Sequence, residues 1–218
     1  MLFRSQAHYL EQIQTKPLAF GFGPAGTGKT YLAVASAVRM LRQGLVRRLI
    51  ITRPVVEAGE RLGFLPGDLQ QKLNPYMRPV HDALFDLIEP EVFGRLEEAG
   101  VIEIAPLAYM RGRTLAASFV ILDEAQNTSI AQMKMFLTRM GEGSHVCVNG
   151  DPSQSDLPPG QKNGLMDAVT RLRGFDAVGV TEFTPDDVVR HPLVARIIRG
   201  YLAPSRRERP GEASGGAP

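Results

Sequence analysis

The sequence is poor in cysteine, has no tryptophan and contains no long apolar run. Its single cysteine, Cys147, cannot form a disulfide within the chain, and its apolar neighbours predict a buried structural thiol. Short apolar runs such as residues 119–122 fall far below the roughly 20 residues of a membrane helix. The first ten residues also lack the apolar core of a secretory signal. These absences favour a cytoplasmic protein with no membrane segment.

The sequence also lacks an excess of charge of either sign. Its 25 Lys and Arg residues face 23 Asp and Glu residues, for a net charge of +2. A charge this small does not predict a nucleic-acid partner, so any such prediction must rest on local patches. The last stretch, residues 203–218, is rich in Pro, Gly, Ser and Arg and has almost no large apolar side chain. We therefore expect one domain over residues 1–202, followed by a disordered tail.

Short apolar segments alternate with helical patterns along the chain. The segments expected to be buried strands are residues 18–22, 48–52, 101–105, 118–123, 146–150 and 177–182. Helical spacing of apolar residues covers residues 28–41 and 132–140. This alternation predicts an α/β fold, in which a mostly parallel sheet has helices on both faces in a three-layer arrangement.

Residues 53–84 break this alternation. They contain four prolines and three glycines and show no clean period. We expect an irregular insertion that leaves the carboxyl edge of the sheet, where open α/β sheets bind ligands.

The strongest motif follows the first expected strand. Residues 23–30 read GPAGTGKT, which fits the phosphate-binding pattern GxxxxGK[ST]. Lys29 would supply charge to the β- and γ-phosphates of ATP, and the Thr30 hydroxyl would bind Mg²⁺. The alternative is a glycine-rich turn without a ligand. The residues predicted to bind nucleotide here are Gly23, Pro24, Ala25, Gly26, Thr27, Gly28, Lys29 and Thr30.

Two further motifs follow expected strands. Asp123 would hold Mg²⁺ and Glu124 would orient the attacking water, unless the two are an acidic pair at a helix start. Residues 150–154 read GDPSQ, and Gln154 or Asp151 could sense the γ-phosphate. An Asp-Pro turn without chemistry is the alternative reading of that segment.

Arginines mark two more segments. Arg111 and Arg113 flank a glycine beside Tyr109, which suits contact with an RNA backbone together with base stacking, although a solvated loop is the alternative. Arg190 lies in the segment DVVRHP and would reach a phosphate as a catalytic arginine, unless it forms a surface ion pair.

Together these segments resemble the PhoH family of P-loop ATPases. The resemblance spans about residues 5–202 and includes TRPVVEAGERLGFLPGDL from Thr52, APLAYMRGRT from Ala105, ILDEAQNT from Ile121 and DVVRHPLV from Asp187. It implies a RecA-like core similar to that of superfamily-one helicases, with Gln154 coupled to the γ-phosphate. It also implies that Gln6 reads adenine. Many members carry an additional N-terminal domain, whereas this chain begins close to Gln6.

The resemblance and the motifs favour an ATPase, helicase-like and coupled to RNA binding or remodelling. The alternatives are a non-catalytic ATP-dependent switch or scaffold that assembles with protein partners, and a P-loop kinase. Because Glu124 could activate water, hydrolysis is favoured over phosphate transfer. One RecA-like domain supplies half of a closed site, so we expect a head-to-tail ring, for which the resemblance implies six subunits. A neighbouring subunit would then supply an arginine, with Arg190 preferred over Arg139, Arg78 and Arg53. The alternative is a monomer that closes its site on a partner protein.

Overall fold

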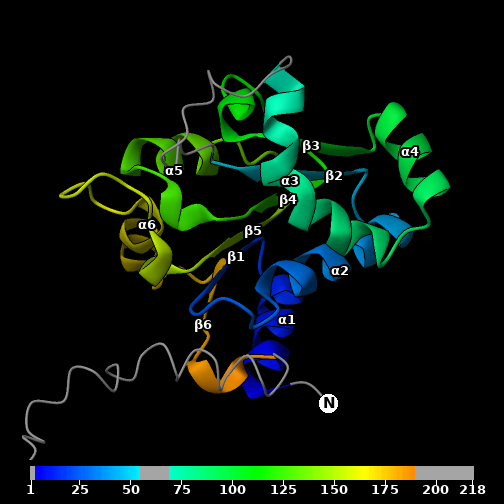
Figure 1. Cartoon of the computed structure of the whole chain (residues 1–218). Coiled ribbons are helices and arrows are strands. Elements are labelled where there is room, and N and C mark those ends of the chain that lie inside the picture. The colour runs from blue at the N-terminus through cyan, green and yellow to red at the C-terminus, as the bar shows by residue number, and fades with distance from the viewer. Residues whose placement is uncertain (1–2, 55–68, 190–218) are drawn as a thin grey trace, which may run out of the picture. The chain divides into compact units, whose positions relative to one another are not determined.

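The structure is a computed structural model that describes residues 3–54 and 69–189 (Figure 1). Its strands are β1 (Leu18–Phe22), β2 (Arg48–Arg53), β3 (Ile102–Pro106), β4 (Ser118–Leu122), β5 (His145–Gly150) and β6 (Val178–Glu182). Its α-helices are α1 (Arg4–Thr15), α2 (Lys29–Arg42), α3 (Leu69–Phe85), α4 (Pro90–Glu98), α5 (Ile130–Leu137) and α6 (Gly164–Leu172).

The six strands form one sheet in the order β3-β2-β4-β5-β1-β6, and every neighbouring pair is parallel. All six expected strands are present, and their ends differ from the expected ones by one residue at most. The central strands β1 and β4 are buried along their whole length, which explains why they read as continuous apolar runs. Cys147 lies in β5 and is buried, as expected.

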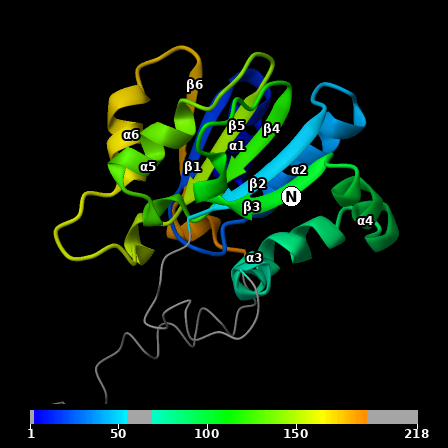
Figure 2. The same cartoon turned by 90° about the horizontal axis from the view of Figure 1, so that it is seen from above.

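Helices cover both faces of this sheet, which confirms the predicted fold class (Figure 2). One buried cluster joins the sheet to α1, α2, α3 and α4 through side chains that include Tyr9, Val34, Val80 and Phe93. The second cluster joins the opposite face to α5 and α6 through side chains that include Met133, Phe136, Leu165 and Val169. The strands are therefore sandwiched, and their carboxyl ends meet along one edge.

The expectation of an irregular segment over residues 53–84 is wrong for its second half, because α3 begins at Leu69. Met77, Val80 and Leu84 are buried and follow one another at spacings of three and four, which is the helical period. Pro75 and Pro79 led to the expectation of an irregular segment, because proline inside a helix costs about 3 kcal/mol. Burial of three large apolar side chains contributes roughly 1.5–3 kcal/mol each, which offsets that cost. Residues 55–68 lie outside the described residues.

Helix α5 begins two residues earlier than expected, because Ser129 caps it. The Ser129 hydroxyl accepts a hydrogen bond from the Gln132 amide at 3.2 Å, so the amino end of the helix is satisfied before the apolar pattern starts. None of the described helices has the length and apolar character that crossing a membrane requires.

Candidate functional site

The carboxyl edge of the sheet brings three predicted motifs together. The loop after β1 contacts the turn after β5, since the Gly23 amide donates to the Gly150 carbonyl at 3.1 Å and the Ala25 amide to Asp151 Oδ2 at 2.9 Å. A cavity of about 240 Å³ opens between these loops and the end of β4. Its lining residues are Ala25, Gly26, Gly28, Lys29, Thr30, Tyr31, Asp123, Glu124, Gly150, Asp151 and Gln154.

The glycine-rich loop owes its shape to backbone conformations that only glycine adopts easily. Gly26 and Gly28 have φ values of 83° and 84°, and Gly28 directly precedes α2. Gly23 is constrained further, because a Cβ at this position would lie 2.3 Å from the Phe183 carbonyl oxygen. The loop therefore turns sharply and meets the amino end of α2, which is the arrangement that binds phosphate.

Lys29 is held inside this loop. Its Nζ donates to the carbonyls of Gly23 and Pro24, each at 2.7 Å, and to the Thr27 hydroxyl at 3.2 Å. Burial lowers the pKa of Lys29, and the nearby carboxylates of Asp151 and Asp123 oppose that shift. The Lys29 ammonium would form stronger hydrogen bonds with an anionic ligand in the cavity than with these partners, because phosphate oxygens are stronger acceptors than neutral carbonyls.

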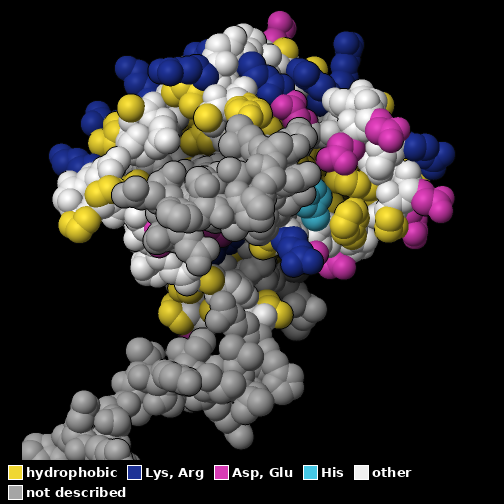
Figure 3. Space-filling view, turned by 45° about the horizontal axis from the view of Figure 1, so that its top comes forward, with side chains coloured by type: hydrophobic (Ala, Val, Ile, Leu, Met, Phe, Trp, Pro, Cys, Tyr) yellow, Lys and Arg dark blue, Asp and Glu magenta, His cyan; other side chains and the backbone are white. Residues whose placement is uncertain are grey.

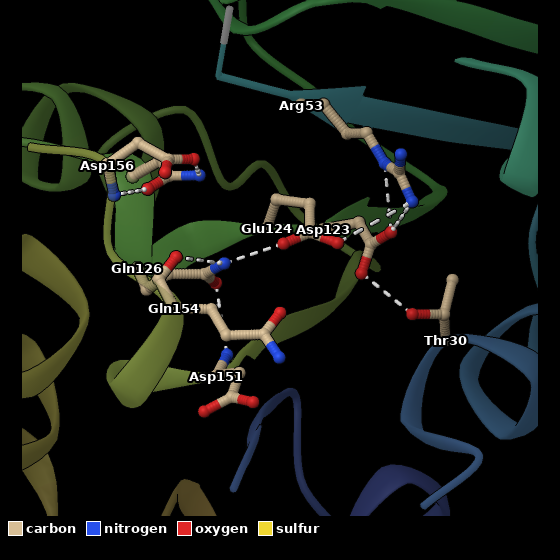
Figure 4. A network of polar contacts seen from close by, with 9 residues as sticks. Thr30, Arg53, Asp123, Glu124, Gln126, Asp151, Gln154 and Asp156 are labelled. Atoms are coloured by element: carbon tan, nitrogen blue, oxygen red, sulfur yellow. Dashed lines mark hydrogen bonds and ion pairs between the residues drawn. The ribbon is translucent and has the colours of Figure 1, made fainter. Parts of the chain in front are cut away.

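Asp123 links the loop to two other elements (Figure 4). Its Oδ1 accepts a hydrogen bond from the Thr30 hydroxyl at 2.7 Å. Its Oδ2 accepts from Arg53 Nε at 2.9 Å and also from Arg53 Nη2. The Asp123 amide donates to the Thr52 carbonyl at 2.9 Å, which fixes the end of β4 against β2. The buried carboxylate thus lies beside the phosphate-binding loop, as the motif predicted.

Glu124 lies next to Asp123 and faces the cavity, with 45% of its side chain exposed. Its backbone is left-handed, with φ at 55°, which turns the chain sharply at the end of β4. Its Oε2 accepts a hydrogen bond from Gln126 Nε2 at 2.6 Å. The two adjacent acids therefore occupy different environments, one buried and paired and one open to the cavity.

Gln126 is a site residue that sequence reasoning missed. Its side chain is buried and also accepts from the Asp151 amide at 3.0 Å, while Nε2 lies 3.4 Å from the Gln154 carbonyl. It thus connects Glu124 to the GDPSQ turn, on which Gln154 lines the cavity. The signal that could have found it is the glutamine two residues after Glu124 in ILDEAQNT.

Gln6 contacts the phosphate-binding loop from α1. Its Nε2 donates to the Thr27 carbonyl at 3.1 Å, and its Oε1 accepts from the Phe3 amide at 3.1 Å. Farther along α1, the Tyr9 hydroxyl donates to Asn149 Oδ1 on β5. Gln6 is therefore buried against the loop, and its predicted contact with adenine stays a prediction.

Neither of the predicted RNA-binding arginines, Arg111 and Arg113, lines this cavity. Both guanidinium Nη atoms of Arg113 bind the Glu103 carboxylate, at 2.5 Å and 2.7 Å. Glu103 lies level with Val120, midway along β4, and belongs to the edge strand β3. Arg113 is close in sequence to β4, but it binds Glu103 midway along the sheet and not at the carboxyl edge. Arg111 is exposed.

The arginines expected to reach a neighbouring subunit are scattered. Arg190 lies outside the described residues. Arg139 donates to the Met135 carbonyl at 3.2 Å at the end of α5, and Arg78 is exposed on α3. Arg53 departs from the expectation, because it binds Asp123 of its own chain.

The residues at the cavity fit Mg²⁺ carried by a nucleotide. Over residues 3–54 and 69–189, no cluster of three His, Cys, Asp or Glu side chains could hold a metal ion by itself. Mg²⁺ commonly uses one or two protein oxygens together with phosphate oxygens and water. The Thr30 hydroxyl and the Asp123 carboxylate, 2.7 Å apart, are protein oxygens of that kind.

Comparison with known proteins shows the family. The model of the PhoH-like protein family matches residues 2–202. The chain belongs to the PhoH-like family. It is 58% identical over 196 residues to a PhoH-like protein of Bacillus subtilis, covering 90% of this chain and 61% of that one. It is 56% identical over 207 residues to a PhoH-like protein of Mycobacterium tuberculosis, covering 95% of this chain and 58% of that one. This PhoH-like chain thus spans about three fifths of the length of these relatives.

The PhoH-like sheet also has a counterpart among solved structures. The large terminase of a thermophilic bacteriophage aligns with a TM-score of 0.53 at 14% identity, covering 94% of this chain and 51% of that one. At that identity the likeness shows a shared fold alone. The expected α/β architecture of the PhoH-like chain is thereby confirmed.

Proposed function

We propose that this PhoH-like chain binds ATP with Mg²⁺ and hydrolyses it. The observation that carries the proposal is the hydrogen bond of 2.7 Å between Thr30 of the phosphate-binding loop and Asp123, with Glu124 open to the same cavity. This contact supports the proposal because a glycine-rich loop with a lysine, a buried carboxylate and a cavity-facing carboxylate then lie together, as ATP hydrolysis with Mg²⁺ requires.

Each residue has a role in this proposal. The loop amides and the amino end of α2 attract the phosphates, and Lys29 turns from the Gly23 and Pro24 carbonyls to the β- and γ-phosphates. Thr30 and Asp123 would hold Mg²⁺, which when bound neutralises charge on the phosphate oxygens. Glu124 holds the attacking water and accepts its proton. Gln126 keeps the Glu124 carboxylate oriented.

Release of inorganic phosphate by the purified protein tests this function directly. We expect turnover that requires Mg²⁺ and stops when the metal is chelated. A protein that binds ATP without releasing phosphate would support the alternative, an ATP-dependent switch or scaffold. Transfer of phosphate to a small molecule in place of water would support a kinase.

We further propose that hydrolysis is coupled to RNA. Support comes from Tyr109, which is 49% exposed, and from the exposed Arg111 close to it. An exposed ring can stack on a base while a nearby guanidinium binds phosphate. Lys and Arg side chains also gather along the upper rim of the face drawn in Figure 3. Turnover measured with and without single-stranded RNA tests the coupling, and equal rates would contradict it.

We also propose that the chain acts in the cytoplasm as a head-to-tail ring of six copies. The described residues contain one sheet, and its cavity is lined by that sheet's own loops and by α2. A second subunit would close the open side and bring an arginine, for which Arg190 remains the first candidate. Light scattering of the purified protein tests the assembly.

A further inference from the structure

We propose that Arg53 is a latch on the metal-binding carboxylate. It holds Asp123 Oδ2, and it turns toward Glu124 and the terminal phosphate when Mg²⁺ takes that oxygen. The proposal rests on the proposed binding of ATP with Mg²⁺, and it assigns to Arg53 a role within its own subunit.

The starting point is how the two oxygens of Asp123 are used. Oδ1 accepts from Thr30 at 2.7 Å, and Oδ2 accepts two donors of the Arg53 guanidinium. The Asp123 side chain is 4% exposed and that of Arg53 is 11% exposed. Water therefore screens this ion pair poorly, and the guanidinium and carboxylate hold each other strongly.

The same carboxylate is the protein group that would hold Mg²⁺. Because Oδ1 faces Thr30, Oδ2 is the oxygen left for the ion or for a water bound to it. A guanidinium and a divalent cation repel each other, and both are attracted to the same carboxylate oxygen. Binding of Mg²⁺ must therefore compete with Arg53 for Asp123.

The path of the displaced side chain is short. Arg53 Nη2 lies 4.0 Å from Glu124 Oε1, and Glu124 lines the cavity. The backbone beneath is fixed, because β2 pairs with β4 along its length and the Thr52 carbonyl accepts the Asp123 amide at 2.9 Å. With that backbone in place, a turn of the Arg53 side chain is enough to bring its guanidinium from Asp123 to Glu124 and toward an incoming γ-phosphate.

Removal of the Arg53 charge should therefore have two opposite effects. Metal binding should improve, because the competing cation is gone. Turnover should fall, because the cation that stabilises charge on the γ-phosphate is also gone. A purely structural role for Arg53 would weaken both.

The test measures the Mg²⁺ dependence of binding of a fluorescent ADP analogue to the full chain, without hydrolysis. For Arg53→Gln we expect half-saturation at about tenfold less Mg²⁺ than for the wild type, with analogue binding in a metal chelator unchanged. Arg53→Lys keeps the charge but not the fork, so its Mg²⁺ dependence should stay near that of the wild type. Arg39→Gln, at an exposed arginine of α2, is the matched control and should change nothing.

The outcomes separate the latch from the proposed function. An Arg53→Gln protein that needs the same or more Mg²⁺ would overturn the latch, whatever its turnover. If Arg53→Gln does not fold, an Arg53→Lys protein that needs less Mg²⁺ than the wild type would overturn it as well. A wild type that binds the analogue with Mg²⁺ but releases no phosphate from ATP would contradict hydrolysis and leave the competition measurable.

Discussion

At the scale of single residues, Lys29 is expected to supply the positive charge that binds the phosphates of ATP. Its ammonium group is buried, and its hydrogen-bond partners in the structure are loop oxygens without charge. We expect Lys29→Ala to lower ATP turnover roughly 100-fold or more, because the phosphates lose their positive partner. The circular dichroism spectrum should stay unchanged. Lys134→Ala, at an exposed lysine of α5, should keep normal turnover, and near-normal turnover of Lys29→Ala would contradict the assignment of the phosphate-binding loop.

Glu124 and Asp123 are adjacent acids that should respond differently to substitution. Glu124→Gln keeps the shape of the side chain and removes the acceptor for the proton of water, so turnover should fall roughly 100-fold or more. Binding of ATP with Mg²⁺ should persist, because Asp123 and Thr30 are unchanged. Equilibrium binding of a fluorescent ATP analogue checks this. Loss of binding in step with turnover would make Glu124 a metal ligand instead.

Gln126 should act through Glu124. Gln126→Glu keeps an acceptor for the Asp151 amide but places a second carboxylate where Nε2 donates to Glu124 at 2.6 Å. We expect turnover to fall roughly tenfold to a hundredfold, because Glu124 is pushed out of line, while the affinity for ATP stays close to normal. Steady-state kinetics that show a raised KM and an unchanged kcat would contradict this positioning role.

At the scale of elements, the Glu103–Arg113 pair ties the edge strand β3 to the segment before β4. The hydrogen bond from Arg113 lowers the pKa of Glu103 below its ordinary value. A carboxyl group with a lowered pKa in the folded state adds stability above its unfolded pKa of about 4.3 and loses it as pH falls. Because the two side chains are 31% and 32% exposed, water screens the pair, and its contribution is at most about 1 kcal/mol.

This pair gives a prediction that separates the two arginines. Arg113→Ala should lower the free energy of unfolding at pH 7 by up to about 1 kcal/mol, and the difference from the wild type should shrink toward pH 3. Arg111→Ala should leave stability unchanged and weaken RNA binding, because Arg111 is exposed beside Tyr109. Urea denaturation at both pH values and RNA titrations at low salt are the measurements. An unchanged RNA affinity of Arg111→Ala would contradict its assigned contact.

The elements differ in how well the sequence predicts them, for physical reasons. β1 and β4 were predictable because both faces of each are buried, which leaves an apolar run between turns. α3 was not, because two prolines lie within its sequence and its stability comes from packing against α2 and α4. The loop motifs predicted residues that line one cavity at the carboxyl edge of the sheet. The contacts of Gln126 with the GDPSQ turn and of Arg53 with Asp123 were not predicted. They depend on which strands lie side by side, and this order cannot be derived from a single sequence.

At the scale of the whole molecule, the described groups of the proposed site come from one sheet's loops and from helix α2. Among residues 3–54 and 69–189, the cavity is lined by the loops after β1, β4 and β5 and by the start of α2. If Arg53 supplies a cation from within the subunit, an arginine from a neighbour adds to it rather than replacing it. Activity should then depend on contact between subunits.

Mixing two inactive variants tests that dependence. Lys29→Ala removes the phosphate-binding lysine and keeps Arg190, whereas Arg190→Ala does the reverse, and each alone should hydrolyse ATP poorly. In a randomly mixed head-to-tail ring, about one quarter of the interfaces pair an intact lysine with an intact arginine, so up to that share of wild-type turnover should return. Lys29→Ala mixed with Glu124→Gln is the control and should restore nothing, because each variant damages the same half of the site. A strictly monomeric protein, with a specific activity that does not change with concentration, would contradict the ring.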